Sequence, residues 1–304
     1  MNRWKLKKLW ISPFQVLPKG DLLYEFLTAI VLGTQCGMSR KWCYWFREHV
    51  VLCRRYAKLA LAGKRLWLFQ PGWSLAPVIL GTHVTGNSVL VTEDRRRLAR
   101  RYVDIAIEMA KEAARKLRAA THDGSLAGTI SELHPKGSPA AVLKHLDAQY
   151  IVGKLDALKS LPSGSIDACM SMGRLEHFSA AELGELFDQM HRILAPDGVG
   201  SHIIDHRDHF WYYDKSIHCF NHLTVDDEKW ASICRGRKWY RNRLLEPDYV
   251  RLFEEHGFAV LKCVHELHRT DAANVDPASL WGPHKNLTRD DLQVAVSHIV
   301  VRRR

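Results

Sequence analysis

Short apolar runs alternate with stretches of helical periodicity from Gly63 to the end of the chain. This alternation indicates a mostly parallel sheet covered by helices, because parallel strands are buried on both faces and need crossover connections. The runs predict strands at residues 65–69, 88–92, 150–153, 166–172, 199–205, 259–267 and 292–301, and helices at 98–117, 140–146 and 248–256. A chain of 304 residues with 46% hydrophobic residues is long enough to bury such a core.

The segment after the fourth expected strand carries the clearest helix signals. Ser179 and Glu182 match a capping box, and Pro196 and Gly198 predict the end of the helix. Its apolar side chains fall on one stripe, formed by Leu183, Leu186, Phe187, Met190 and Leu194.

The front of the chain is strongly basic. The net charge is +11, and the first 65 residues hold 13 basic and 3 acidic side chains. We therefore expect two parts, a basic N-terminal helical segment at 1–62 and an α/β domain at 63–304 with an aromatic and histidine-rich insertion at about 206–245. The basic segment can meet an anionic membrane surface, an anionic substrate or nucleic acid, and a solvated helical surface is an equally simple alternative.

Cysteine usage and hydropathy indicate a cytoplasmic protein. The seven cysteines form no CxxC pair, which argues against a disulfide framework or a zinc knuckle. The apolar run from Leu22 to Gly33 is interrupted by Glu25 and is too short to cross a bilayer. We expect a cytoplasmic location, with the basic segment able to approach the inner face of the membrane.

The run DALKSLPSGSIDACMSMGRLEHFSAAELGELFDQMHRILAPDGVG, residues 156–200, resembles the second half of a class I S-adenosylmethionine-dependent methyltransferase domain of type 11. The matching positions are Asp156, Leu161, Pro162, Asp167, Glu176, His177 and the turn at 194–198, where Asp197 replaces the usual glycine. The resemblance implies a Rossmann-like, mostly parallel seven-stranded sheet with an antiparallel last strand, and S-adenosyl-L-methionine as cofactor. The stretch from Ile203 to Trp230 is similar to a bacterial branch associated with cell-surface polysaccharide metabolism, which implies a small-molecule or glycan-type acceptor.

The loop FQPGWSLAP at 69–77 stands where these enzymes carry their glycine-rich cofactor loop. It keeps Gly72, but Gln70 replaces a glycine and Leu68 replaces an acidic residue. We expect Gln70, Gly72 and Trp73 to border the cofactor, Ser74 to cap the next helix and Pro77 to lie in its first turn.

Acidic residues after the next strands complete the expected cofactor site. Glu93 lies 21 residues after Gly72, close to the spacing at which an acidic side chain reaches a ribose hydroxyl, and Asp94 is its neighbour. By resemblance, Asp156 faces the adenine, and Ala157 and Gly173 also border the cofactor. The alternative is that Glu93 and Asp94 cap the following helix and that Asp156 lies in a turn.

The predicted catalytic residues are His177 and His209, either of which can act as the general base. The predicted acceptor-binding residues share this crevice or the insertion, and they are Asp205, Arg207, Asp208, Tyr212, Arg241 and Arg243. The aromatic insertion is either a platform for a planar or sugar acceptor or a satellite core. We expect no resident metal ion, although a metal alternative built on His202, Asp205, His206, Asp208 and His209 stays open.

These observations predict a methyltransferase with a small-molecule or glycan-type acceptor. Two alternatives remain. The substitutions at Leu68 and Gln70 favour a catalytically silent domain of the same fold, and the basic front favours a nucleic-acid-directed methyltransferase. The nucleic-acid alternative is the weaker one, because the sequence at the end of the fourth strand is SMGRLEHF, whereas many base-modifying relatives carry an Asn-Pro-Pro-Tyr-like motif there.

Overall fold

A computed structural model describes the chain at residues 13–14, 17–31, 38–94, 100–121, 130, 133, 137–153, 155–235, 240–268 and 275–304. Its centre is one sheet of seven strands in the order β3-β2-β1-β4-β5-β7-β6. The strands are β1 (Leu66–Phe69), β2 (Val89–Glu93), β3 (Gln149–Val152), β4 (Ile166–Met172), β5 (Leu194–Asp205), β6 (Phe258–Leu267) and β7 (Val294–Arg303). Strands β1 to β5 pair in parallel, and β7 is antiparallel to both of its neighbours. The predicted fold is confirmed.

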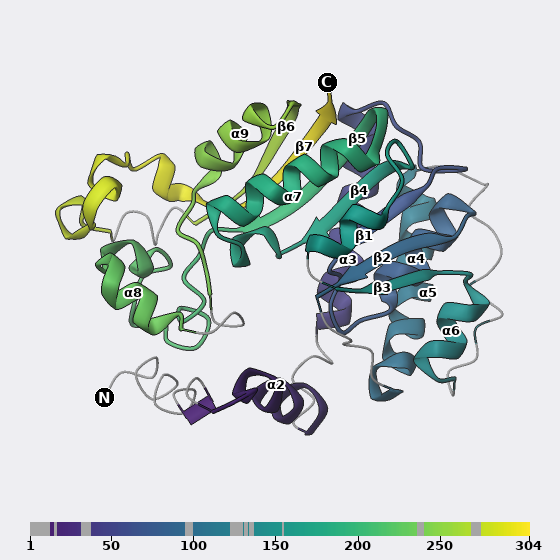
Figure 1. The fold of residues 1–304 in the computed structure, drawn as a ribbon, viewed down its shortest axis with the longest axis horizontal. Coiled ribbons are helices and arrows are strands. Elements are labelled where there is room, and N and C mark those ends of the chain that lie inside the picture. The colour runs from purple at the N-terminus through teal and green to yellow at the C-terminus, as the bar shows by residue number, and fades with distance from the viewer. Residues whose placement is uncertain are drawn as a thin grey trace.

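Helices cover both faces of the sheet (Figure 1). On one face, α3 (Met38–Tyr56), α4 (Ala76–Thr85), α5 (Val103–Thr121) and α6 (Pro139–His145) contribute to the larger core. On the other face, α7 (Ala180–Ile193) and α9 (Glu246–Glu255) pack through aromatic side chains, and the rings of Phe187 and Phe253 stack at 4.2 Å. Because Trp42, Trp45 and Phe46 of α3 lie in the same core as β1 and β4, this part of the basic segment is built into the domain.

The helix that the sequence marks most clearly forms as predicted. Ser179 and Glu182 make the capping box of α7, which ends at Ile193. Strand β5 then begins five residues before the predicted start, because the turn with Pro196 and Gly198 lies within it. Asp197 adopts a φ of 61° there, a left-handed conformation that a short polar side chain tolerates better than most.

The start of α4 corrects one local prediction. The N-cap is Leu75 and its side chain makes no capping hydrogen bond, whereas Ser74 Oγ accepts from the N–H of Ala76 at 3.2 Å. Pro77 lies in the first turn as expected, where its missing N–H costs nothing.

A side lobe lies beyond the ends of β5 and β7, on the left of Figure 1. It contains α8 (Asp227–Ile233) and has its own small core, to which Cys219, Phe220 and Leu223 contribute together with Leu280 and Leu292 from the connection between β6 and β7. The insertion expected at about 206–245 thus packs with a second segment, and much of it is a satellite core. Trp239 lies outside the described residues.

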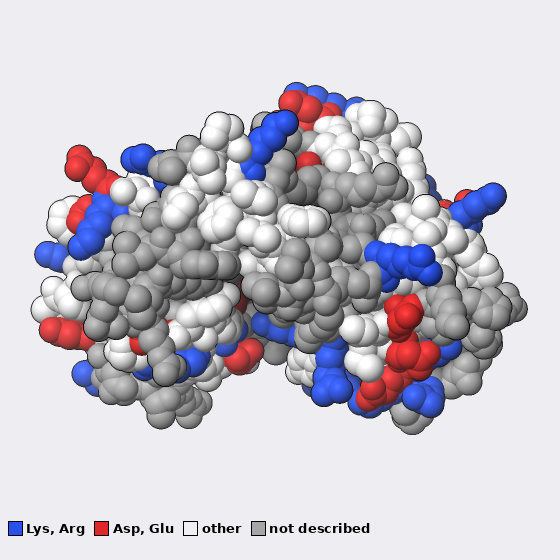
Figure 2. All heavy atoms as spheres, turned by 90° about the horizontal axis from the view of Figure 1, so that it is seen from below, with Lys and Arg blue, Asp and Glu red and all other residues white. Residues whose placement is uncertain are grey.

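The front of the chain forms α2 (Gly20–Glu25) and a turn of π-helix at Phe26–Val31. Within the described residues, we find no helix whose length and hydropathy would let it cross a bilayer. On the face in Figure 2, described Lys and Arg side chains lie beside Asp and Glu side chains. The basic residues from 1 to 12 lie outside the described part.

Candidate functional site

The predicted site residues follow strands whose carboxyl ends meet at one edge of the sheet. Phe69 of β1 lies in register with Thr92 of β2 and with Ser171 of β4, so the chain leaves all three strands at about the same level. The order of strands reverses between β1 and β4, and ligands of open α/β sheets bind outside the carboxyl ends of the strands at such a point.

The loop after β1 keeps the backbone path of a glycine loop although it has lost a glycine. Gln70 has a φ of 49° and Gly72 a φ of 81°, both in the left-handed region. The N–H of Gln70 donates to the carbonyl of Thr92 at 2.8 Å. A left-handed conformation costs a residue with a side chain about 1–2 kcal/mol, so this local strain at Gln70 is maintained by the surrounding contacts.

Glu93 joins this loop to the second strand. Its side chain is fully buried, and Oε1 accepts a hydrogen bond from the N–H of Gly72 at 2.5 Å. A buried carboxylate requires partners, and here the backbone of the loop is one of them. Glu93 therefore lies beside Gly72, and its contact with a ribose hydroxyl stays a prediction. Asp94 follows the strand and is only partly buried.

Arg174 lies over the loop, which the sequence did not predict. Its Nε donates to the carbonyl of Gln70 at 2.7 Å, and Nη2 is 2.5 Å from where a Cβ on Gly72 would stand. Trp42 of α3 is also close to this point, and Trp45 lies near the Cβ position of Gly173. We call the space above Gly72 the hollow, and the Arg174 guanidinium occupies it beside Trp42 of α3.

The other predicted cofactor residues are spread around this edge. Trp73 packs edge to face on Tyr102, with ring centroids 6.0 Å apart. Asp156 is exposed and pairs with Lys159 at 2.6 Å, so its role toward adenine stays a prediction. Ala157 lies against Gly153, where an added Cβ would stand 2.5 Å from that of Ala157.

Glu176, His177 and His209 come together beside Gly173. Their candidate ligand atoms all lie within 4.8 Å of one another, and the imidazole centroids are 5.2 Å apart. Glu176 is 3% exposed, and its Oε2 is buried without a hydrogen-bond partner. Burial raises the pKa of Glu176 to about 7, and burial followed by the charge of Arg241 lowers the pKa of His177 to about 3. The two predicted catalytic histidines are thus neighbours, joined by a carboxylate that sequence reasoning had treated only as part of a motif.

Two buried groups fix the turn that carries this cluster. His177 Nδ1 lies 2.9 Å from the carbonyl of Tyr240, which requires Nδ1 to be the protonated nitrogen. Asn242 Nδ2 donates to the carbonyls of Leu175 and Phe178 on either side of the cluster. Glu176 and His177 are therefore held from the segment after 240.

Asp205 is the centre of an ionic network at the end of β5. Arg207 Nε donates to its Oδ1 at 2.9 Å and the Tyr212 hydroxyl to its Oδ2 at 2.5 Å, while Arg241 donates to its backbone carbonyl. Burial acts to raise the pKa of Asp205, but the charges of Arg241 and Arg207 outweigh it and hold that pKa well below its usual value. The predicted acceptor residues Asp205, Arg207, Tyr212 and Arg241 thus form one unit, and Arg241 Nη1 also contacts His209.

Lys41 of α3 reaches the same crevice. Its Nζ lies 4.1 Å from the centroid of the Trp45 ring. Burial lowers the pKa of Lys41, and the nearby Asp205 carboxylate acts in the opposite direction. Lys41 was counted only as part of the basic segment, because a sequence gives no sign of which helix face meets the site.

Asp208 and Arg243 are occupied elsewhere. Asp208 accepts from the N–H of Phe210 at 2.8 Å and from Asn221, which organises the turn into the side lobe. Arg243 donates to the carbonyl of Val225 and pairs with Asp227 of α8. The contacts of both side chains stabilise the side lobe. These contacts do not direct either side chain toward Glu176, His177 and His209.

The metal grouping considered along β5 is not assembled among the described residues. His202 Nδ1 bonds Ser171 Oγ at 2.8 Å, and its ring stacks on Phe253. His206 lies between Ser297 Oγ and the carbonyl of Leu244. Both imidazoles are structural, and only His209 of that set joins a potential ligand group.

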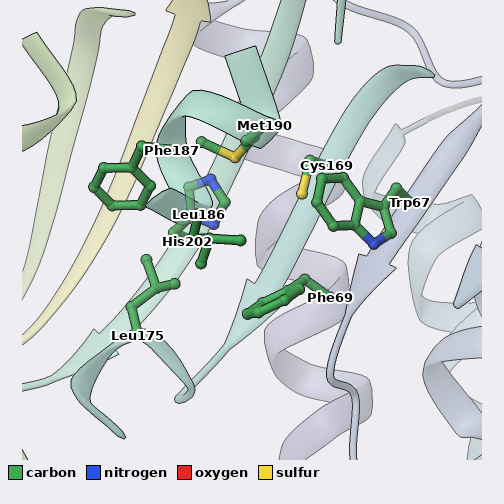
Figure 3. A pocket seen from close by; sticks show the side chains of 8 residues that line it. All are labelled: Trp67, Phe69, Cys169, Leu175, Leu186, Phe187, Met190 and His202. Atoms are coloured by element: carbon green, nitrogen blue, oxygen red, sulfur yellow. The ribbon is translucent and has the colours of Figure 1, made fainter. Parts of the chain in front are cut away.

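A gap in the packing lies between the sheet and α7 (Figure 3). It is too narrow for a water molecule and is lined by Trp67, Phe69, Cys169, Leu175, Leu186, Phe187, Met190 and His202. An apolar gap of this size cannot hold an adenosyl group, so it is a packing feature of the core.

The residues present fit S-adenosylmethionine. Gly72 provides a place where any side chain would close the hollow, and Glu93 provides a carboxylate against the loop. Arg174 lies across this hollow and is only partly buried, so its side chain has to turn aside or bind the ligand.

Comparison with known proteins agrees with the fold. Residues 85–201 match a family model described as a methyltransferase domain. No curated protein matches the chain. Among solved structures, an S-adenosylmethionine-dependent methyltransferase from Methanosarcina mazei is similar at 14% identity and a TM-score of 0.45, over 81% of this chain and 94% of that one. One from Mesorhizobium loti is similar at 13% identity and a TM-score of 0.42, over 81% and 93%.

A third structure is the geranyl diphosphate C-methyltransferase of Streptomyces coelicolor A3(2), in complex with Mg²⁺, geranyl diphosphate and S-adenosyl-L-homocysteine. It is similar at 10% identity and a TM-score of 0.43, over 86% of this chain and 75% of that one. Likeness at this level says nothing about the acceptor. The family match at residues 85–201 and the sheet order, with β7 antiparallel in a parallel sheet, agree with the predicted Rossmann-like methyltransferase fold.

Proposed function

We propose that the chain transfers a methyl group to a small-molecule or glycan-type acceptor bound beside Glu176, His177 and His209. The observation that carries the proposal is the closeness of two features at one sheet edge. One is the loop with Gly72 and Glu93, and the other is a partly buried cluster of proton-accepting groups that begins four residues after Met172 of β4. Methyl transfer to a hydroxyl group needs a methyl donor placed beside the acceptor and a side chain that accepts the hydroxyl proton.

Each residue of the loop has a proposed part in holding the cofactor. Gly72 leaves room for it, and Glu93 is the carboxylate nearest to a ribose hydroxyl. Arg174 supplies a cation over the loop, and the carboxylate of the methionine part is the group that a guanidinium binds well. Gln70, Trp73, Asp94, Asp156, Ala157 and Gly173 would border the same ligand.

When bound, S-adenosylmethionine supplies a sulfonium methyl group, whose C–S bond breaks with the electron pair going to sulfur as the acceptor oxygen bonds the carbon. The proton of that oxygen then passes to the cluster of Glu176, His177 and His209. His177 can accept it only at Nε2, because Nδ1 faces the carbonyl of Tyr240. In-line placement of the acceptor accounts for most of the rate that such an enzyme gains.

The charges beside the cluster support a small polar acceptor over a nucleic acid. Asp205, Arg207 and Arg241 are buried and bring both signs of charge together, whereas a phosphate backbone calls for a basic surface. Tyr212 is 38% exposed, and its ring can form a face for a sugar while its hydroxyl is held by Asp205.

The test is methyl transfer from tritiated S-adenosylmethionine to pooled simple glycosides and phenols, with total RNA and DNA assayed in parallel. The proposal predicts label in the small-molecule or glycan fraction. Label confined to nucleic acid would favour the nucleic-acid alternative. A protein that binds S-adenosylhomocysteine no better than albumin does and labels none of these fractions would be a silent domain.

A further inference from the structure

We infer that Glu176, His177 and His209 form a binding site for one divalent first-row transition metal ion of the Zn²⁺ type. Two histidines and one carboxylate are the ligand set of many catalytic zinc and non-haem iron sites, and they leave coordination positions open. The inference rests on the proposed function, because the acceptor is proposed to bind beside the same three side chains.

The geometry needs little change to bind an ion. Bonds of about 2.0–2.2 Å at tetrahedral angles place the ligand atoms of one cation about 3.3–3.6 Å apart. The candidate atoms here lie within 4.8 Å of one another, so the side chains would have to draw together by about 1 Å to bind an ion. Glu176 and His177 are adjacent in sequence on one short turn, and His209 approaches from the segment after β5.

The state of Glu176 is a second and independent sign of a ligand. Its Oε2 is buried with no hydrogen-bond partner, which is rare for a carboxylate and costs folding free energy. Gly173 and Trp45 lie beside Glu176 on the loop side, and neither offers it a side-chain donor that the structure records. A cation at the cluster would satisfy this oxygen.

His177 is already held as metal-binding histidines usually are. Such a histidine donates its other ring N–H to a carbonyl or carboxylate, which fixes the tautomer and the ring orientation. The carbonyl of Tyr240, 2.9 Å from Nδ1, takes that position and leaves the lone pair of Nε2 directed elsewhere.

At His209, the guanidinium of Arg241 occupies the position that the metal ion would take. Its guanidinium donates to His209 Nε2 and to the carbonyl of Asp205. One imidazole nitrogen cannot accept from Arg241 and bind a metal at once, so metal binding has to displace this contact. Asp205, 3.9 Å from Arg241 Nη2, can hold the displaced guanidinium.

A bound metal would change how the acceptor loses its proton. An acceptor hydroxyl coordinated at an open position has a lowered pKa and releases its proton to water before methyl transfer. In that case Glu176, His177 and His209 act as metal ligands, and none of them has to accept the proton of the acceptor hydroxyl.

The experiment is titration of chelator-treated full-length protein with Co²⁺, followed by its visible d–d absorption, with S-adenosylhomocysteine binding measured on the same samples. We expect one Co²⁺ per chain in an N/O environment. H209A and E176Q should each weaken Co²⁺ binding at least about tenfold. H209A is the more secure variant for folding, because His209 is only partly buried.

H256A is the matched control, because His256 pairs with one carboxylate, Asp188, at 2.6 Å on the surface away from the cluster. It should leave the absorption unchanged. The inference is overturned if the wild-type protein shows no stoichiometric band, or if H256A reduces the band as much as H209A. If the metal site is absent but the protein still binds S-adenosylhomocysteine, the proposed function remains supported. If the protein does not bind S-adenosylhomocysteine, the proposed function is rejected as well.

Discussion

The N–H of Gly72 donates to Glu93 Oε1 at 2.5 Å, a contact that joins the loop after β1 to the end of β2. The two residues are 21 positions apart, and the parallel register of β1 and β2 brings them to one edge. The contact holds the buried Glu93 carboxylate at the edge where we propose that the cofactor binds.

Substitution of Glu93 should therefore weaken cofactor binding. E93Q keeps the shape and removes the charge, and a hydrogen bond to a charged group contributes about 1.5–3 kcal/mol. We expect the Kd for S-adenosylhomocysteine to rise about 10- to 100-fold by calorimetry. E112Q is the control, because Glu112 pairs with Lys116 on the exposed surface of α5, and it should bind nearly as the wild type does.

Alanine substitutions at Gly72 and Gly86 distinguish the effect of backbone strain from the effect of lost space for the cofactor. Both have positive φ, 81° and 68°, but a Cβ on Gly72 would stand 2.5 Å from Arg174 Nη2, whereas a Cβ on Gly86 would meet nothing within 4 Å. G72A and G86A should each lower the free energy of unfolding by about 1–2 kcal/mol. Only G72A should also lose affinity for S-adenosylhomocysteine. Equal binding by both variants would place the cofactor elsewhere.

Gln70 distinguishes an active enzyme from a silent domain. Because Gln70 already has a φ of 49°, Q70G should leave the loop where it is. We expect S-adenosylhomocysteine affinity to change by less than about tenfold, or 1.4 kcal/mol. Binding seen only in Q70G would show that the natural loop excludes the cofactor.

Buried histidines should make stability depend on pH. His298 shares Ser201 Oγ with His49, and burial, followed by the charge of His202, lowers the pKa of His298 to about 3. The unfolded chain binds this proton at about pH 6.5. The stabilising contribution is therefore complete above pH 6.5 and is lost as the pH falls toward 3.

Urea unfolding of the wild type and of H298Q between pH 7.5 and pH 5 measures this contribution. The difference between the two proteins should shrink by up to about 1.4 kcal/mol per pH unit below pH 6.5. A difference that stays constant with pH would mean that His298 has the same pKa in the folded protein as in the unfolded chain.

Periodicity and caps were sufficient to predict most of the fold. Alternating apolar runs located every strand of the sheet, and the capping box of Ser179 and Glu182 located the start of α7. The early start of β5 was missed, because Pro196 and Gly198 are turn residues and a turn inside a strand follows from tertiary pairing.

The site was predictable where sequence spacing fixes position. Glu93 reaches Gly72 because both follow parallel strands. Arg174 and Lys41 were missed, because their importance depends on side-chain direction across the loop and on how α3 packs. Arg243 was assigned from its charge, but its partner Asp227 lies in a helix that no local pattern connects to it.

Calorimetric titration of the wild-type protein with S-adenosyl-L-homocysteine tests the central claim, cofactor binding at the edge formed by Gly72 and Glu93. We predict saturable binding of one molecule per chain that E93Q weakens and E112Q does not. Absence of heat and of thermal stabilisation at millimolar ligand would contradict the account.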